Sequence, residues 1–140
     1  MAAPSYRLLE HPADLGFEVQ APSLSGLFAA AAAAFLDILW DPAGIAPREH
    51  LAIEVSGEDL PELLVAFLGE ILFLAEARGF GFCRIAVGEL AGGRLAGQAW
   101  GEPWDPQRHQ SRTVVKAVTY HQIFVGQEGE AWRARVFLDL

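Results

Sequence analysis

Residues 59–79 read DLPELLVAFLGEILFLAEARG, and this stretch carries the strongest structural signal in the sequence. Apolar side chains recur at helical spacing over residues 60–75 and form one broad apolar face. Asp59 and Glu62 occupy the positions of a helix capping box, and Gly79 is a typical residue after a helix end. The pattern therefore predicts a helix whose apolar face must be buried against other elements.

A second helical stripe runs from Leu24 to Leu39, with Ser23 as its expected N-cap and Asp41-Pro42 as its stop. The remaining apolar segments alternate like strands and are separated by turn residues. We expect strands at residues 6–8, 15–19, 51–55, 81–87, 95–101, 114–125 and 132–138. Two helices among clusters of strands predict a single α+β domain over residues 1–140. We expect a two-layer sandwich, in which the two main helices pack on a mixed, largely antiparallel sheet.

Composition narrows the classes of function. The 140 residues carry a formal net charge of −8, and such a surface repels phosphate backbones, so we expect no autonomous nucleic-acid binding. The sequence shows neither a run of about 18 apolar residues nor the pattern of a secretory signal, which predicts a cytoplasmic protein without a membrane span. The single cysteine, Cys83, excludes an intrachain disulfide and predicts a buried structural thiol.

Two aspartates near the ends of the sequence form the first candidate site. Asp14 follows the turn after the first predicted strand, and Asp139 lies at the end of the last, one residue before Leu140. If these two strands meet, the carboxylates of Asp14, Asp139 and the chain terminus crowd together. Their repulsion would raise some pKa values, or a hard cation such as Ca²⁺ or Mg²⁺ would neutralise them. The alternative is that both aspartates are solvated strand ends.

Residues 101–109, GEPWDPQRH, form the second candidate site. This polar segment contains Asp105, Arg108 and His109 around Trp104, and loops of this kind often bind partners. The alternative is a rigid surface connection with Trp104 folded back onto the core. Lys116, the single lysine of the chain, either borders the sheet or presents a point charge to a phosphate or carboxylate.

Five segments in this order resemble the archease family along nearly the whole length of the chain. They are YRLLEHPADLGF at residues 6–17, LLVAFLGEILF at 63–73, GEPWDPQRH at 101–109, VKAVTYH at 115–121 and FLDL at 137–140. One departure is Pro12, where the family usually has threonine, so a hydroxyl near Asp14 is missing.

The resemblance implies a protein that is not itself a catalyst. Archease assists the tRNA-splicing RNA ligase, which joins a 2′,3′-cyclic or 3′-phosphate end to a 5′-hydroxyl through a GTP-derived guanylate. Family metal ligands map onto Asp14, Asp139 and Leu140, with Ca²⁺ as the implied ion and Mg²⁺ as the alternative, and an essential basic residue maps onto Lys116.

Two other functions remain open from the sequence. One is a general chaperone or modulator of RNA-modifying enzymes such as tRNA methyltransferases. The other is a metal-dependent hydrolase, for which the sequence offers no convincing general base. The oligomeric state is not predicted.

Overall fold

The computed structural model describes residues 5–11 and 14–140. The predicted turn at Pro12 and Ala13, including the departure at Pro12, lies outside the described residues. The elements follow the order β1 (Tyr6–His11), β2 (Asp14–Ala21), α1 (Leu24–Leu39), η1 (Pro42–Gly44), β3 (Glu49–Ser56), α2 (Leu60–Arg78), β4 (Phe80–Ala91), β5 (Arg94–Pro103), β6 (Ala117–Val118), β7 (Phe124–Glu128) and β8 (Ala131–Asp139).

Both predicted helices form, and their ends follow from local hydrogen bonds. The Asp59 carboxylate accepts the amide hydrogen of Glu62 at 2.8 Å, and α2 ends at Gly79 with φ of 64°. The Glu62 side chain instead accepts from the amide of Glu58 at 3.4 Å, so only the Asp59 half of the predicted capping box is present. Ser23 caps α1 as predicted by accepting the amide hydrogen of Gly26.

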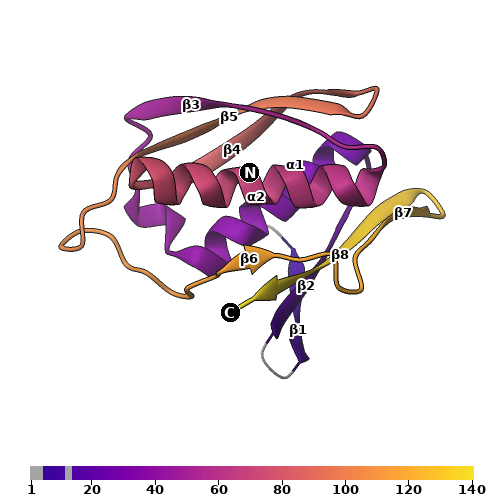
Figure 1. Cartoon of the computed structure of the whole chain (residues 1–140), viewed down its shortest axis with the longest axis horizontal. Coiled ribbons are helices and arrows are strands. Elements are labelled where there is room, and N and C mark those ends of the chain that lie inside the picture. Colours follow the sequence, from indigo (N-terminus) through magenta and orange to yellow (C-terminus); the bar gives the residue numbers. More distant parts are fainter. Residues whose placement is uncertain (1–4, 12–13) are drawn as a thin grey trace.

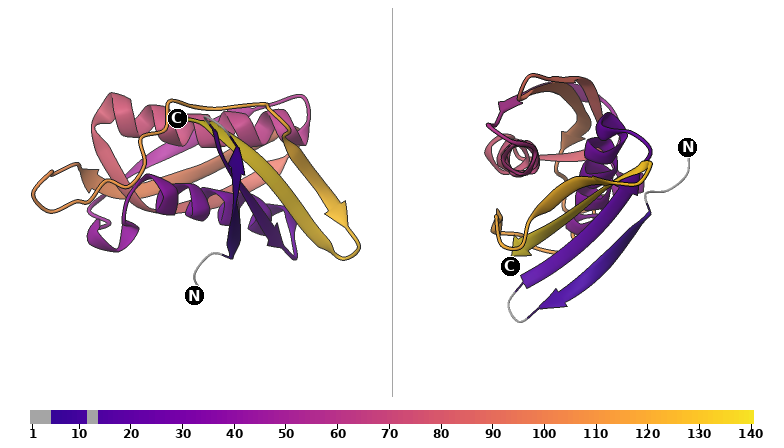
Figure 2. Two further views of the ribbon diagram at one scale, coloured as in Figure 1. Left: turned by 90° about the horizontal axis from the view of Figure 1, so that it is seen from below. Right: turned by 90° about the vertical axis from the view of Figure 1, so that its right-hand side faces the viewer.

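The strands form two antiparallel sheets, so the largely antiparallel pairing is confirmed and the prediction of one sheet is wrong. One sheet has the order β1-β2-β8-β6, with β7 also paired to β8, and the other has the order β3-β5-β4. Figure 1 shows the two helices between these sheets, and the right-hand view of Figure 2 shows the same layering from the side. The α+β class with two main helices is confirmed, but the helices are covered on two sides instead of one.

The helices are covered by a sheet on both sides because their apolar surfaces are broad. Nine residues of the 16-residue α1 are buried, which is more than one side of a helix can present to a single sheet. The largest fully buried side chains include five phenylalanines that come from both helices and both sheets. They are Phe17, Phe28, Phe35, Phe67 and Phe82. The core therefore lies around the helices, between the sheets.

The prediction of one strand over residues 114–125 is wrong. Within this range only Ala117–Val118 and the beginning of β7 are strands, and a turn at residues 121–122 separates them. The amides of Arg112 and Thr113 donate to the carbonyl oxygen of Leu39 at the end of α1, so the chain follows the helix there and rejoins the sheet only at Lys116. Gln122 takes a positive φ of 49° in the turn.

In the part of the chain that the structure describes, no helix is long and apolar enough to cross a membrane.

Candidate functional site

Asp14 and Asp139 meet as predicted, but the strand that pairs with the last one is the second predicted strand and not the first. β2 pairs antiparallel with β8, and in this register Asp14 lies directly opposite Asp139. Side chains of directly opposite residues project from the same face, with Cβ atoms about 4.5–5.5 Å apart. The two carboxylates therefore share one face at one end of the sheet, where Figures 1 and 2 also place the C-terminus.

Lys116 lies beside this pair. Its backbone amide donates to the carbonyl oxygen of Asp139 at 2.8 Å, and the next residue, Ala117, is the strand partner of Asp139. Val115 is buried and fixes the segment to the core, while the side chain of Lys116 is exposed. The structure thus brings Asp14, Asp139 and Lys116 to adjacent positions, and we call these three residues the tip.

The residues next to the tip on β2 and β8 are closely packed. Val136 and Leu138 of β8 are buried on the inner face, and Asp139 lies on the other side together with Phe137. The Phe137 ring covers Gly16, since a Cβ atom at position 16 would lie 2.6 Å from its Cε1 atom. This packing explains why a glycine precedes Phe17 in the second strand.

The tip offers oxygen donors that suit a hard cation. Two carboxylates directly opposite each other repel, and a cation between them would remove that repulsion. Leu140 follows Asp139 and is 39% exposed, so its main-chain oxygens lie next to the pair in the chain. Among the described residues, no group of three or more His, Cys, Asp or Glu side chains is placed to hold a metal. The two facing carboxylates are therefore the side-chain oxygen donors at this place, and a hard cation would need main-chain oxygens and water to complete its shell.

The second candidate site is organised by Glu102, which the sequence analysis missed. Its side chain is fully buried and accepts hydrogen bonds from the amide of Ala46 at 2.8 Å, from Nε2 of His109 at 2.9 Å and from Arg108 at 3.1 Å. These hydrogen bonds, led by the Ala46 amide, lower the pKa of Glu102 to about 2. A glutamate within seven residues of an arginine and a histidine was the available signal.

His109 uses both ring nitrogens within the chain. The backbone amide of Asp105 donates to Nδ1 at 2.8 Å, so Nδ1 carries no proton and Nε2 donates to Glu102. The Asp105 carboxylate accepts from the amide of Gln107 and from Arg108, and these bonds lower its pKa. The side chain of His109 is fully buried, which gives this histidine a structural position.

Trp104 is folded back onto the core, as the alternative interpretation of this segment required. Its ring lies 5.6 Å from that of Trp40 and 5.1 Å from that of His109, measured between centroids. We call residues 104–110 the Glu102 loop, because Arg108 and His109 of this loop bind the buried Glu102 that precedes it. Figure 1 shows this orange segment beyond the end of β5, apart from the C-terminus, so Asp105, Arg108 and His109 form a cluster separate from the tip.

Cys83 is half-buried, with its Sγ atom 3.4 Å from the carbonyl oxygen of Trp100. Burial raises the pKa of this thiol, which disfavours the thiolate that a nucleophile needs.

The family model described as the Archease protein family (MTH1598/TM1083) matches residues 6–140. The chain belongs to the archease family. It is 42% identical over 135 residues to the protein archease of Methanopyrus kandleri, with 94% of this chain and 96% of that protein covered. It is 35% identical to the protein archease of Pyrococcus furiosus over 135 residues, 94% of this chain and 95% of that one.

Two solved structures share the archease fold. The solution structure of protein 1598 of Methanobacterium thermoautotrophicum superposes with a TM-score of 0.81 at 28% identity, covering 96% of this chain and 98% of that one. The crystal structure of an archease from Thermotoga maritima, described as a possible chaperone, superposes with a TM-score of 0.66 at 22% identity over 94% of each chain. The second likeness shows the fold alone.

The archease segments of the sequence acquire positions in this fold. Residues 6–17 and 137–140, from opposite ends of the sequence, meet through the pairing of β2 with β8. Residues 115–121 border the same end of β8 through β6. Residues 63–73 supply the buried face of α2, and residues 101–109 contain Glu102 and most of its loop. Three of the five segments therefore build the tip.

Proposed function

We propose that this archease activates, without itself catalysing, the GTP-dependent tRNA-splicing RNA ligase that joins 3′-phosphate to 5′-hydroxyl ends. It promotes guanylylation of the ligase and its repeated turnover in tRNA splicing and RNA repair. The observation that carries the proposal is the tip, where Asp14 and Asp139 lie opposite each other and Lys116 is exposed beside them.

In this proposal a divalent cation, Ca²⁺ first and Mg²⁺ as the alternative, is held by Asp14, Asp139 and the main-chain oxygens of Leu140. The ion supplies positive charge that neutralises the facing carboxylates and stiffens the end of the sheet. The ammonium group of Lys116 then orients a triphosphate, or pairs with a carboxylate, at the mouth of the ligase active site. Lysine suits either role because it is a compact charge on a flexible stem.

The overall charge supports a protein partner over RNA. A net charge of −8 repels the phosphate backbone, while it complements the basic cleft expected of an RNA ligase. The protein can therefore approach the ligase without competing for its substrate.

The Glu102 loop has a secondary role in this proposal. Asp105 and His109 hold the loop in shape through Glu102, and the side chain of Arg108 is 52% exposed and can contact the ligase. The Glu102 loop thus contributes binding surface, and the tip contributes the activating charge.

The test is a single-turnover guanylylation assay of the cognate ligase with GTP, with and without this protein. Lys116→Ala should keep the melting temperature and lower the stimulated rate at least tenfold. Arg94→Ala is the matched control, because it removes an exposed cation from the other sheet and should leave stimulation intact. Full stimulation by Lys116→Ala would remove the proposal.

Two further assays on the same purified protein distinguish the alternative functions, a general chaperone and a metal-dependent hydrolase. Equal stimulation of unrelated tRNA methyltransferases would favour a general chaperone. Release of phosphate from phosphoester substrates by the isolated protein would favour a hydrolase.

A further inference from the structure

The sheet formed by β3, β5 and β4 has an outer face that the helices do not cover. Both helices lie on the opposite side of this sheet (Figure 1). We call the outward-facing residues 50–56 of β3, 94–100 of β5 and 84–91 of β4 the outer face. His50, Ala52, Glu54 and Ser56 are all exposed along its β3 edge. An uncovered sheet face of this kind is available for a partner.

One row of the outer face is aromatic and basic. His50 and Arg84 are the strand partners of Trp100 on its two sides. The guanidinium of Arg84 lies 3.9 Å from the centroid of the Trp100 ring, and the His50 ring lies 6.1 Å away. Stacking on the indole fixes the guanidinium while its edge stays available for a carboxylate. The row is therefore a basic, aromatic protrusion whose guanidinium is already held in place.

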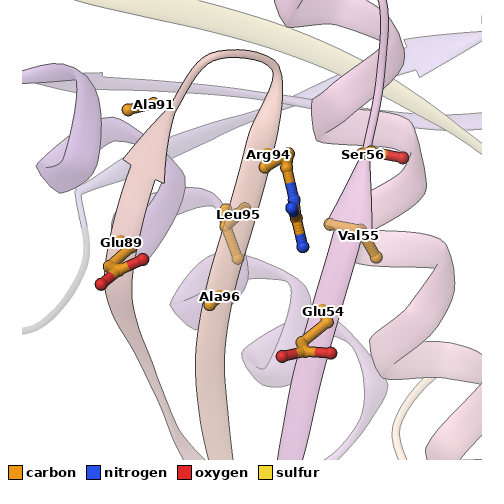
Figure 3. A pocket seen from close by; sticks show the side chains of 8 residues that line it. All are labelled: Glu54, Val55, Ser56, Glu89, Ala91, Arg94, Leu95 and Ala96. Carbon is orange, nitrogen blue, oxygen red and sulfur yellow. The ribbon is translucent and has the colours of Figure 1, made fainter.

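A second row, four residues before Trp100 on β5, is acidic and lies under a hollow in the surface. Ala96 lies between Glu54 on β3 and Glu89 on β4. A shift in strand register between Val87 and Glu89 is what places Glu89 opposite Ala96. The hollow above this row has a volume of about 510 Å³, and Figure 3 shows the two carboxylates on either side of the strand that carries Ala96. Arg94 lies between β5 and β3 in the same view, so the hollow keeps a net negative charge.

The two rows are equally far from the small, neutral row formed by Ala52, Gln98 and Ala86. We propose that the outer face packs against the outer face of a second copy of this chain, around a two-fold axis that crosses the strands at Gln98. This rotation places Trp100 of each copy over Ala96 of the other. It also places Arg84 opposite Glu89 and His50 opposite Glu54, so each basic row fits an acidic one.

The size of the outer face sets the strength of this dimer. Three strands about 4.8 Å apart and seven residues of about 3.4 Å each cover on the order of 300 Å² per copy, below the roughly 800 Å² per partner of stable complexes. Two chains of charge −8 also repel, although physiological salt screens charges beyond about 8 Å. The dimer is therefore weak and concentration-dependent. It leaves the tip accessible in both copies, because the tip belongs to the other sheet.

The test is sedimentation velocity in about 0.15 M salt, over about 10 μM to 1 mM protein, the range in which a weak dimer dissociates. We expect reversible dimerisation of the unaltered chain. Arg84→Glu and Glu89→Arg should each weaken it at least tenfold, and the double variant should restore it because both pairs are exchanged. Arg78→Glu, which reverses an exposed charge on α2, is the control.

Three results would overturn the proposal: a monomer at all concentrations, single variants that associate normally, or a double variant no better than the singles.

Crosslinking gives a second readout that needs no charge reversal. A Gln98→Cys, Cys83→Ala chain should be joined to itself by a bismaleimide about 10 Å long, the spacing of packed sheets. Gln127→Cys in the same background should not, since β7 belongs to the other sheet.

Discussion

Substituting Gly16 by alanine probes the packing beneath the tip. A Cβ atom at this position would lie 2.6 Å from Cε1 and 2.8 Å from Cδ1 of Phe137, about 1 Å closer than carbon atoms normally approach. The Phe137 ring is 4% exposed and has the His121 ring 5.5 Å away, so it has little room to move. The substitution therefore forces either the ring or the strand out of position.

The magnitude follows from the cost of overpacking. Extra atoms in a well-packed region typically destabilise a protein by 1–3 kcal/mol, and we expect about 2 kcal/mol for Gly16→Ala. An unfolding entropy of about 2.1 cal/mol/K per residue gives about 0.3 kcal/mol/K for this chain length, and so a fall in melting temperature of about 7 °C. Gly69→Ala is the matched control. Nothing lies within 4 Å of its added Cβ in α2, so helix propensity should raise stability by about 0.5–1 kcal/mol.

Thermal melting of four variants tests this reasoning. Phe137→Leu removes the ring atoms that the new methyl group meets, so the loss in the Gly16→Ala, Phe137→Leu chain should be at least about 1 kcal/mol smaller than the sum of the single losses. Additive losses of unfolding free energy would show that the added methyl group at position 16 does not collide with the Phe137 ring. An unchanged melting temperature for Gly16→Ala would refute the close packing itself.

Three further predictions concern other parts of the structure. The pKa of Glu102 is lowered in the folded state to about 2, so its ionisation stabilises the fold above the unfolded pKa near 4.5 and this stability is lost as the pH falls toward 2. Glu102→Gln should therefore unfold at lower denaturant concentration than the unaltered chain at pH 7, and the gap should narrow below pH 4.5. Asp59→Ala removes the cap of α2 and should lower the free energy of unfolding by about 1 kcal/mol, which calorimetry measures as a fall of about 3 °C. Ca²⁺ at about 100 times its dissociation constant should stabilise the unaltered chain by about 2.7 kcal/mol. Asp139→Asn should abolish this shift, and an equal shift in both chains would show that the ion binds elsewhere.

The helices and the tip could be predicted from the sequence because their causes are local or lie at the ends of the chain. Ser23, Asp59 and Gly79 act through hydrogen bonds or backbone angles of their own neighbourhood. The meeting of Asp14 with Asp139 required only that the strand after the first turn pairs with the last strand. Neither inference depended on how the central strands are arranged.

The division into two sheets could not be predicted in the same way. Alternating apolar residues show that a segment forms a strand, but they do not show which strand it pairs with. Residues 114–118 alternate as a strand should, yet the end of α1 binds the amides of Arg112 and Thr113 and leaves two residues for β6. The role of Glu102 could be predicted only in part, because Arg108 and His109 lie within seven residues of it but its third partner, Ala46, lies 56 residues away in the chain.

The most direct test of the tip is a double-mutant cycle of Asp14→Asn and Asp139→Asn in the ligase guanylylation assay. If the two carboxylates act as one unit, each substitution alone should remove most of the stimulation and the double variant should lose no more than either. Stimulation that survives both single substitutions, or losses that multiply in the double variant, would contradict the account.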